Sequence, residues 1–133
     1  MTTFDFIEKY KVNKKICDDL LKYYKANKEY KVPKPHIDNT TEAYFFNPST
    51  DKKIINFFKT LSKHVNEYVL KYDMQNKVKT TMSNHIQHYS ANTGYFNLHY
   101  ERSFHYRSRQ LVYMLYLNTV KDKGGTEFPY QQK

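Results

Sequence analysis

The sequence predicts an α+β fold in which two helical segments come first and a meander of strands follows. Apolar residues recur at intervals of three and four in two stretches of the first half, which is the period of an amphipathic helix. From residue 73 onward, β-branched residues and tyrosines replace this pattern. All three glycines, Gly94, Gly124 and Gly125, lie in the second half, where they mark turns between strands.

Composition indicates one globular domain over residues 1–133. The chain is 39% hydrophobic and 17% aromatic, mostly tyrosine, which excludes a disordered class. The single cysteine, Cys17, excludes an intramolecular disulfide and a four-thiolate metal site. Neither a signal peptide nor an apolar run of membrane-spanning length is visible, so we expect a cytoplasmic protein without a membrane partner. The net charge of +9 comes from lysines spread along the chain, which favours solvated helix faces over a nucleic-acid surface.

The first helix is expected over residues 13–27 and the second over residues 50–72. Asn13 can cap the first, and the second begins after Asn47 or Ser49. Apolar side chains share one face of the second helix: Ile54, Phe58, Leu61, Val65, Tyr68, Val69 and Tyr72. Residues 28–50 are predicted to be irregular because prolines interrupt them. Residues 1–75 thus form a helical support region.

Residues 76–133 are predicted to contain four strands, over 78–89, 95–100, 110–118 and 126–130. His99 and Glu101 lie two residues apart at the end of the second strand. Alternate strand residues point the same way, so imidazole and carboxylate share a face. They are two of the three ligands of the facial triad that holds non-haem Fe(II).

Spacing alone does not make that pair a metal site. A second triplet of the same kind, His36-Ile37-Asp38, follows two prolines inside the segment predicted to be irregular. His36 is therefore interpreted as a loop histidine. The context of His99, at the end of an aromatic and apolar run, is what favours a site there.

The order of motifs in the second half supplies that context. The motifs are, in chain order, Gln87-x-Tyr89, Gly94, His99-x-Glu101, Arg109, Tyr113-x-Leu115-Tyr116-Leu117-Asn118 and Gly124-Gly125-x-Glu127. Together they resemble the 2-oxoglutarate and Fe(II)-dependent dioxygenases, in particular the prolyl 4-hydroxylase-like branch. The resemblance implies helices packed on a double-stranded β-helix, or jelly roll, here incomplete at its C-terminal end.

The resemblance also implies the site and its cofactors. His99 and Glu101 correspond to Fe(II) ligands, and Tyr89 and Tyr116 to tyrosines that bind the cosubstrate 2-oxoglutarate. Arg109 matches a frequent arginine of the family; it is expected to lie behind the metal ligands, with its role open. The implied activity is hydroxylation of a peptidyl prolyl or similar C–H substrate, or of a small molecule, with succinate and CO2 as coproducts and ascorbate as an optional reductant.

The chain departs from the family in two respects. The carboxylate is Glu101, where aspartate is commoner, and neither the distal histidine nor the basic residue that binds the cosubstrate appears before Lys133. Three sources for the missing ligand stay open: a longer natural chain, a second chain, or a local histidine such as His88 or His105. Incomplete sheets leave unpaired edges, so we expect a homodimer or a strand swap.

The alternative is a non-catalytic, basic and tyrosine-rich module that binds nucleic acid or protein. Its feature is aromatics interleaved with arginines, as at Tyr100, Arg102, Tyr106, Arg107 and Arg109. An oxygenase site requires metal, whereas such a module shows steep salt dependence and needs no metal.

Overall fold

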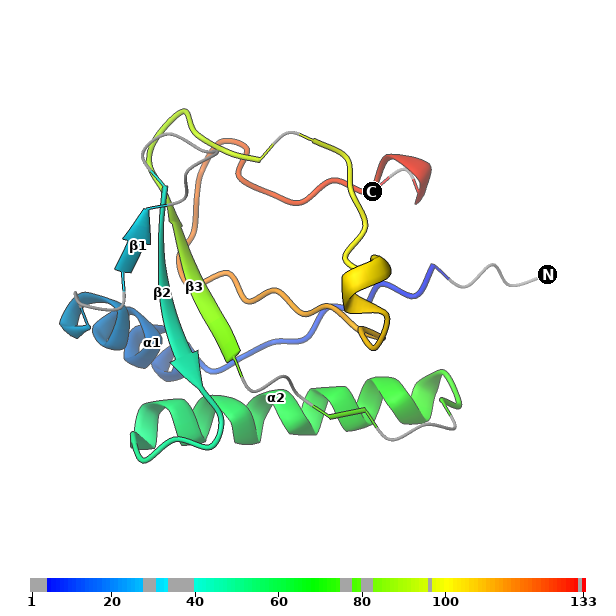
Figure 1. Ribbon diagram of the computed structural model, residues 1–133, viewed down its shortest axis with the longest axis horizontal. Helices are drawn as coiled ribbons and strands as arrows, with labels where there is room; N and C mark the ends of the chain where they lie inside the picture. Colours follow the sequence, from blue (N-terminus) through cyan, green and yellow to red (C-terminus); the bar gives the residue numbers. More distant parts are fainter. Residues whose placement is uncertain are drawn as a thin grey trace.

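The computed structural model describes residues 5–27, 31–33, 40–74, 78–79, 83–95, 97–131 and 133. It has the predicted α+β class, with two helices and a three-stranded antiparallel sheet in the order β1-β2-β3. Figure 1 shows α2 crossing below the ends of β2 and β3, with α1 beside it. Neither helix in the described ranges is long and apolar enough to cross a membrane.

The first helix, α1 (Lys14–Ala26), confirms the prediction and its cap. The Asn13 side chain accepts a hydrogen bond from the Lys15 amide at 2.9 Å, which satisfies one of the free N–H groups of the first turn. Leu20 is buried on the face that Ile16, Tyr23 and Tyr24 share. The helix therefore contributes one apolar stripe to the core.

The second helix, α2 (Lys52–Lys71), lies where it was predicted but has a different cap. Asp51 accepts from the Lys53 amide at 2.8 Å, in place of the predicted Asn47 or Ser49. Ser49 instead accepts from the Asp51 amide and so fixes the turn before the helix. The buried side chains of α2 are Ile54, Phe57, Phe58 and Leu61.

The prediction that residues 28–50 are irregular was wrong, because they contain β1 (Lys31–Pro33) and the central strand β2 (Thr40–Phe46). Pro33 is tolerated because β1 is an edge strand. The missed signal was the run of Thr, Tyr and Phe in β2, typical of strands. The triplet of His36 lies outside the described residues.

The third strand, β3 (Ser83–Tyr89), confirms the later part of the strand predicted over 78–89. It pairs with β2 so that Ala43 lies opposite Ile86 and Phe45 lies opposite Asn84. These four residues are buried on the face that carries the helices. The alternate residues of both strands point to the opposite, helix-free face.

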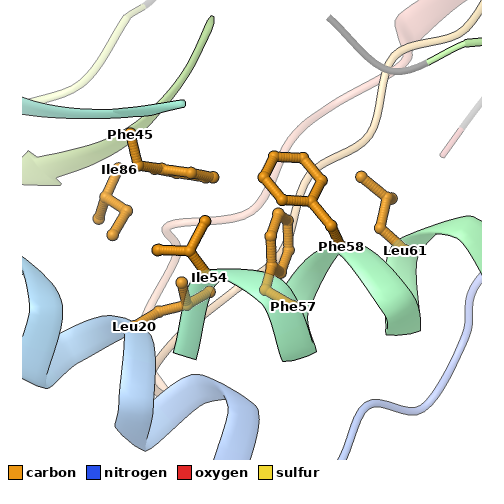
Figure 2. Packing of buried hydrophobic residues seen from close by; sticks show 7 residues of the cluster. All are labelled: Leu20, Phe45, Ile54, Phe57, Phe58, Leu61 and Ile86. Carbon is orange, nitrogen blue, oxygen red and sulfur yellow. The ribbon is translucent and has the colours of Figure 1, made fainter. Parts of the chain in front are cut away.

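The core joins β2, β3, α1 and α2. Its buried members, shown in Figure 2, are Leu20, Phe45, Ile54, Phe57, Phe58, Leu61 and Ile86. The ring of Phe45 lies 5.5 Å from that of Phe57 and 5.8 Å from that of Phe58, measured between centroids. Edge and tilted contacts of this kind add to the free energy gained from burying the rings.

The strands predicted over 95–100, 110–118 and 126–130 are not formed. Within residues 97–131, the regular structure is confined to two 3₁₀ turns, at Phe104–Tyr106 and Pro129–Gln131. High β-propensity does not make a strand without a neighbour to complete the hydrogen-bonded ladder.

Side chains, rather than a ladder, attach the segment around residues 113–117 to the core. Leu115 and Leu117 pack against the buried cluster. The Tyr113 hydroxyl donates to Asn84 Oδ1 at 2.6 Å, and its ring lies 5.9 Å from that of Phe57. Every second residue of this segment, Tyr113, Leu115 and Leu117, therefore contacts the core, as predicted for a strand, although no strand forms.

Much of the second half is uncovered. The chain exposes 11476 Å², whereas a compact monomer of this mass exposes about 7,400 Å². Exposed large apolar side chains concentrate after residue 94: Tyr95, Leu98, Tyr100, Phe104, Tyr106, Val112, Tyr113, Met114, Tyr116, Val120 and Tyr130. This surface is therefore available for contacts with other molecules.

Two leucines of α2 test the placement of its buried face. Leu61 is 9% exposed and Leu70 is 80% exposed. Leu61→Ala should lower the free energy of unfolding by about 2–5 kcal/mol, because it opens a cavity in the core. Leu70→Ala should change that free energy by less than about 0.5 kcal/mol. Urea denaturation followed by circular dichroism measures both, and equal losses would contradict this helix orientation.

We expect ionisation of Tyr113 to lower the free energy of unfolding at alkaline pH. Although 40% of the Tyr113 surface is exposed, its hydroxyl lies against Asn84, and desolvation there raises the pKa of Tyr113 to about 12. Folding favours the neutral phenol, and this preference adds to the free energy of unfolding. The added stability is fully present below the unfolded pKa of about 10 and is lost as the pH rises toward 12. Tyr113→Phe should cost roughly 1 kcal/mol at neutral pH through the lost hydrogen bond. The same substitution should flatten the alkaline decline in urea-unfolding experiments, whereas Tyr130→Phe should leave both quantities unchanged.

Candidate metal centre

The candidate site lies in a loop that a single 3₁₀ turn folds back on itself. The amide of Tyr106 donates to the carbonyl of Ser103 at 3.0 Å, and that of Arg109 donates to the carbonyl of Tyr106 at 3.1 Å. This reversal brings Arg109 back to Glu101, eight residues earlier in the chain. Local backbone hydrogen bonds, rather than a sheet, thus position the site.

The structure brings His99 and Glu101 together, as the sequence predicts. His99 Nε2 lies 3.2 Å from Glu101 Oε1. The two side chains are half-buried, with 50% and 42% of their surfaces exposed. The expected side-by-side arrangement therefore forms without the expected strand.

Both ring nitrogens of His99 face acceptor oxygens. Nδ1 lies 3.0 Å from the carbonyl oxygen of Asn97, and Nε2 faces the Glu101 carboxylate. A neutral imidazole carries only one N–H and can donate to only one of them. With the proton on Nδ1, the lone pair of Nε2 points at the carboxylate. In that tautomer a second proton or a metal ion would lie between Nε2 and Oε1, whereas with the proton on Nε2 the imidazole donates directly to Glu101 in an ordinary hydrogen bond.

Arg109 fixes the other side of the carboxylate. Its Nη1 donates to Glu101 Oε2 at 2.9 Å and approaches the Glu101 carbonyl oxygen at 3.4 Å. The guanidinium stacks on Tyr106, with Cζ 4.1 Å from the ring centroid. Oε2 is thereby occupied while Oε1 stays directed at His99. Hydrogen bonds behind metal ligands commonly orient them in this way.

The geometry of the pair fits two ligands of one metal ion. Bonds of about 2.1 Å place two donor atoms about 3.0 Å apart at an octahedral right angle and about 3.4 Å apart at a tetrahedral angle. The observed 3.2 Å between Nε2 and Oε1 lies between these values. Within the described ranges, however, no group of three or more His, Cys, Asp or Glu side chains could hold a metal.

The two local histidines considered as a third ligand lie against other rings. The His88 ring is 6.0 Å from that of Tyr24, and the His105 ring is 5.6 Å from that of Phe104. Since the described residues form no three-donor cluster, neither completes the site in this structure. The chain as described therefore offers two donors and their supporting contacts.

The two predicted cosubstrate tyrosines are engaged elsewhere. The Tyr89 hydroxyl donates to Gln87 Oε1 at 3.2 Å on the helix-free face of β3. The Tyr116 hydroxyl lies 2.8 Å from Thr126 Oγ1 and accepts from the Thr126 amide at 3.1 Å. Neither hydroxyl makes one of these contacts with His99 or Glu101.

Sequence reasoning missed a polar cluster on the same helix-free face. Glu42 is nearly buried, and it accepts from the Tyr44 hydroxyl at 2.8 Å and from Gln87 Nε2 at 2.7 Å. The hydrogen bond to Glu42 raises the pKa of Tyr44. The sequence did contain a signal for this cluster, because Glu42 and Tyr44 alternate with Ala43 and Phe45 along β2. The prediction that residues 28–50 are irregular concealed it.

A groove of about 680 Å³ lies far from these residues in the sequence. It runs between the β2–α2 turn and one face of α2, and Lys59 and Lys63 line it together with Asn and Ser side chains. None of the predicted site residues lines it. It is open to solvent, and the apolar residues Pro48, Ile55 and Phe58 complete its lining.

Arg109 can be tested as a positioning residue. Arg109→Gln should weaken binding of Co(II), a spectroscopic probe for divalent metals, about 10- to 100-fold, because Glu101 loses the contact that orients it. Arg107→Gln is the matched control, since Arg107 stacks on Phe104 and not on the pair. Titrations followed by visible absorption measure both affinities. Equal weakening in the two variants would indicate a general charge effect.

Comparison with known protein families, curated proteins and solved structures finds no match for this chain. The case for a function therefore depends on the geometry of the His99–Glu101 pair and on the contacts of Arg109.

Proposed function

We propose that this chain belongs to an Fe(II)- and 2-oxoglutarate-dependent oxygenase that hydroxylates a peptidyl prolyl or similar C–H substrate, with succinate and CO2 as coproducts. One observation carries the proposal. His99 Nε2 and Glu101 Oε1 converge at 3.2 Å, while Asn97 and Arg109 hold the remote atoms Nδ1 and Oε2. Each ligand thus has one atom directed inward and one atom fixed from behind.

The chemistry of the two donors favours Fe(II). One imidazole nitrogen and one carboxylate oxygen are the ligand types of the facial triad, which leaves positions free for a cosubstrate. Soft thiolate ligation is not involved, since Cys17 lies on α1 with its thiol directed at the carbonyl of Tyr116. When bound, the iron and 2-oxoglutarate together supply the oxidising power for C–H hydroxylation.

The residues of this chain orient the reactants. His99 and Glu101 would hold the iron, and Arg109 would orient the Glu101 carboxylate through its hydrogen bond to Oε2. Tyr89 and Tyr116 are proposed to donate hydrogen bonds to carboxylate oxygens of 2-oxoglutarate, after exchanging their present contacts with Gln87 and Thr126. Both hydroxyls are accessible, since Tyr89 and Tyr116 are exposed.

The proposed fold is a jelly roll, of which β1, β2 and β3 are one wall. Two features of this sheet support it. The helices cover one face only, and the other carries Glu42, Tyr44, Gln87 and Tyr89, a polar and aromatic set suited to line a ligand pocket. A second copy of the chain, with exchanged strands, is proposed to supply the third ligand and the basic partner of 2-oxoglutarate.

An anaerobic titration of the chain with Fe(II) and 2-oxoglutarate tests the proposal. A visible metal-to-ligand charge-transfer band should appear in the wild type and vanish in His99→Ala and Glu101→Ala, because each removes a ligand. Glu101→Asp should retain the band, since a carboxylate remains. His105→Ala is the matched control and should behave as the wild type.

Two results would contradict the proposal: a band that persists in His99→Ala, or no band in the wild type at saturating cosubstrate. Light scattering on the same sample tests whether a second copy can supply the third ligand. That source requires twice the 16.1 kDa mass of one chain, so a monomeric mass excludes it.

A further inference from the structure

The turn beside the metal site presents aromatic rings and arginines together. We name it the aromatic–arginine turn, made of Tyr100, Arg102, Phe104, Tyr106 and Arg107. Tyr100 is 81% exposed and Phe104 is 74% exposed, and both arginines are exposed. A group of exposed aromatic side chains close together in the chain is a candidate surface for contact with another molecule.

Stacking organises this turn. Arg107 lies over Phe104, with Cζ 4.2 Å from the ring centroid, and the neighbouring Arg109 covers Tyr106 in the same way at 4.1 Å. Each pair places a flat cation on one face of a ring. Because Phe104 remains largely exposed, its ring and the guanidinium of Arg107 still offer flat surfaces to a ligand.

The charge around the turn is positive. Glu101 is the only acidic residue between positions 97 and 109, and Arg109 already binds it. Arg102 and Arg107 are thus not needed to neutralise a nearby carboxylate in this stretch. The whole chain carries +9. An anionic partner is therefore favoured at this turn.

We propose that the aromatic–arginine turn binds single-stranded nucleic acid. Unpaired bases stack on exposed rings, while arginines neutralise the phosphates between them. An acidic peptide satisfies the arginines but leaves the ring faces without a matching flat partner. A duplex fits poorly, since the turn has only a three-residue 3₁₀ segment to enter a groove. This binding is independent of the proposed oxygenase activity and needs no metal.

Fluorescence anisotropy with a labelled oligothymidylate of about 12 nucleotides, within the size range of single sites, tests the proposal in the presence of a metal chelator. The full chain should bind at low salt, with a log–log salt slope of about −1.4 for two neutralised phosphates. Phe104→Ala should weaken binding about 5- to 150-fold through the lost stacking. Arg107→Gln should reduce the slope by about 0.7.

Matched variants separate this turn from general effects. Phe46→Ala removes an exposed phenylalanine of β2, and Lys25→Gln removes an exposed cation of α1, and both should bind as the wild type. Circular dichroism should be unchanged in all four variants because the substituted residues are exposed.

Three results would overturn the proposal. One is no anisotropy change at low salt. Another is equal loss of affinity in Phe104→Ala and Phe46→Ala. The last is displacement of the oligonucleotide by polyglutamate or by anionic phospholipid vesicles as effectively as by unlabelled oligothymidylate, which would assign the turn to an acidic peptide or to a lipid surface.

Discussion

The contact between Phe45 of β2 and the two phenylalanines of α2 is the interaction on which the rest of the structure depends. It joins the central strand to the longest helix, and every other element attaches to this unit: α1 through Leu20, β3 through Ile86 and the second half of the chain through Leu115 and Leu117. Burial of one such ring contributes about 1.5–3 kcal/mol. No comparable apolar cluster forms within the described residues after position 94, where the large apolar side chains are mostly exposed.

This division of the molecule explains how the candidate site is built. Asn97, His99, Glu101 and Arg109 lie within thirteen residues, and their mutual hydrogen bonds and one 3₁₀ turn hold them. The site therefore does not depend on the sheet for its internal geometry. Its relation to Tyr89 and Tyr116 does depend on longer-range packing, and those two tyrosines are the predicted residues that do not join it.

The sequence was informative where local physics decides the structure. The apolar period of 3.6 residues located both helices, since an amphipathic helix carries its own pattern and its backbone bonds close within it. His99 and Glu101 do lie in contact, but the strand from which their proximity was predicted does not form, and a local turn places them instead. Cap identity was less predictable, because Asn47, Ser49 and Asp51 are all good capping residues and tertiary packing selects among them.

Strands were predicted less well because a strand needs a partner that its own sequence does not specify. Residues 110–118 have strand-like composition, and Leu115 and Leu117 do point into the core, yet the segment has no ladder. The opposite error occurred in β2, a strand that was predicted to be irregular because prolines precede it. In the structure, β2 pairs with β1 on one edge and with β3 on the other. The jelly-roll arrangement depends on such long-range pairing, and it was expected from the motif resemblance rather than from the residues themselves.

An ordinary ion pair and the proposed metal site make different demands on His99 and Glu101. A half-exposed ion pair contributes about 0–1 kcal/mol to stability, and it gains little from contacts that order both partners, since ordering costs side-chain entropy. Here Asn97 fixes the far nitrogen of the imidazole and Arg109, itself stacked on Tyr106, fixes the far oxygen of the carboxylate. Such support has little value for a surface ion pair. The proposed metal site would benefit from it, because a preorganised ligand pair loses less entropy when a metal binds.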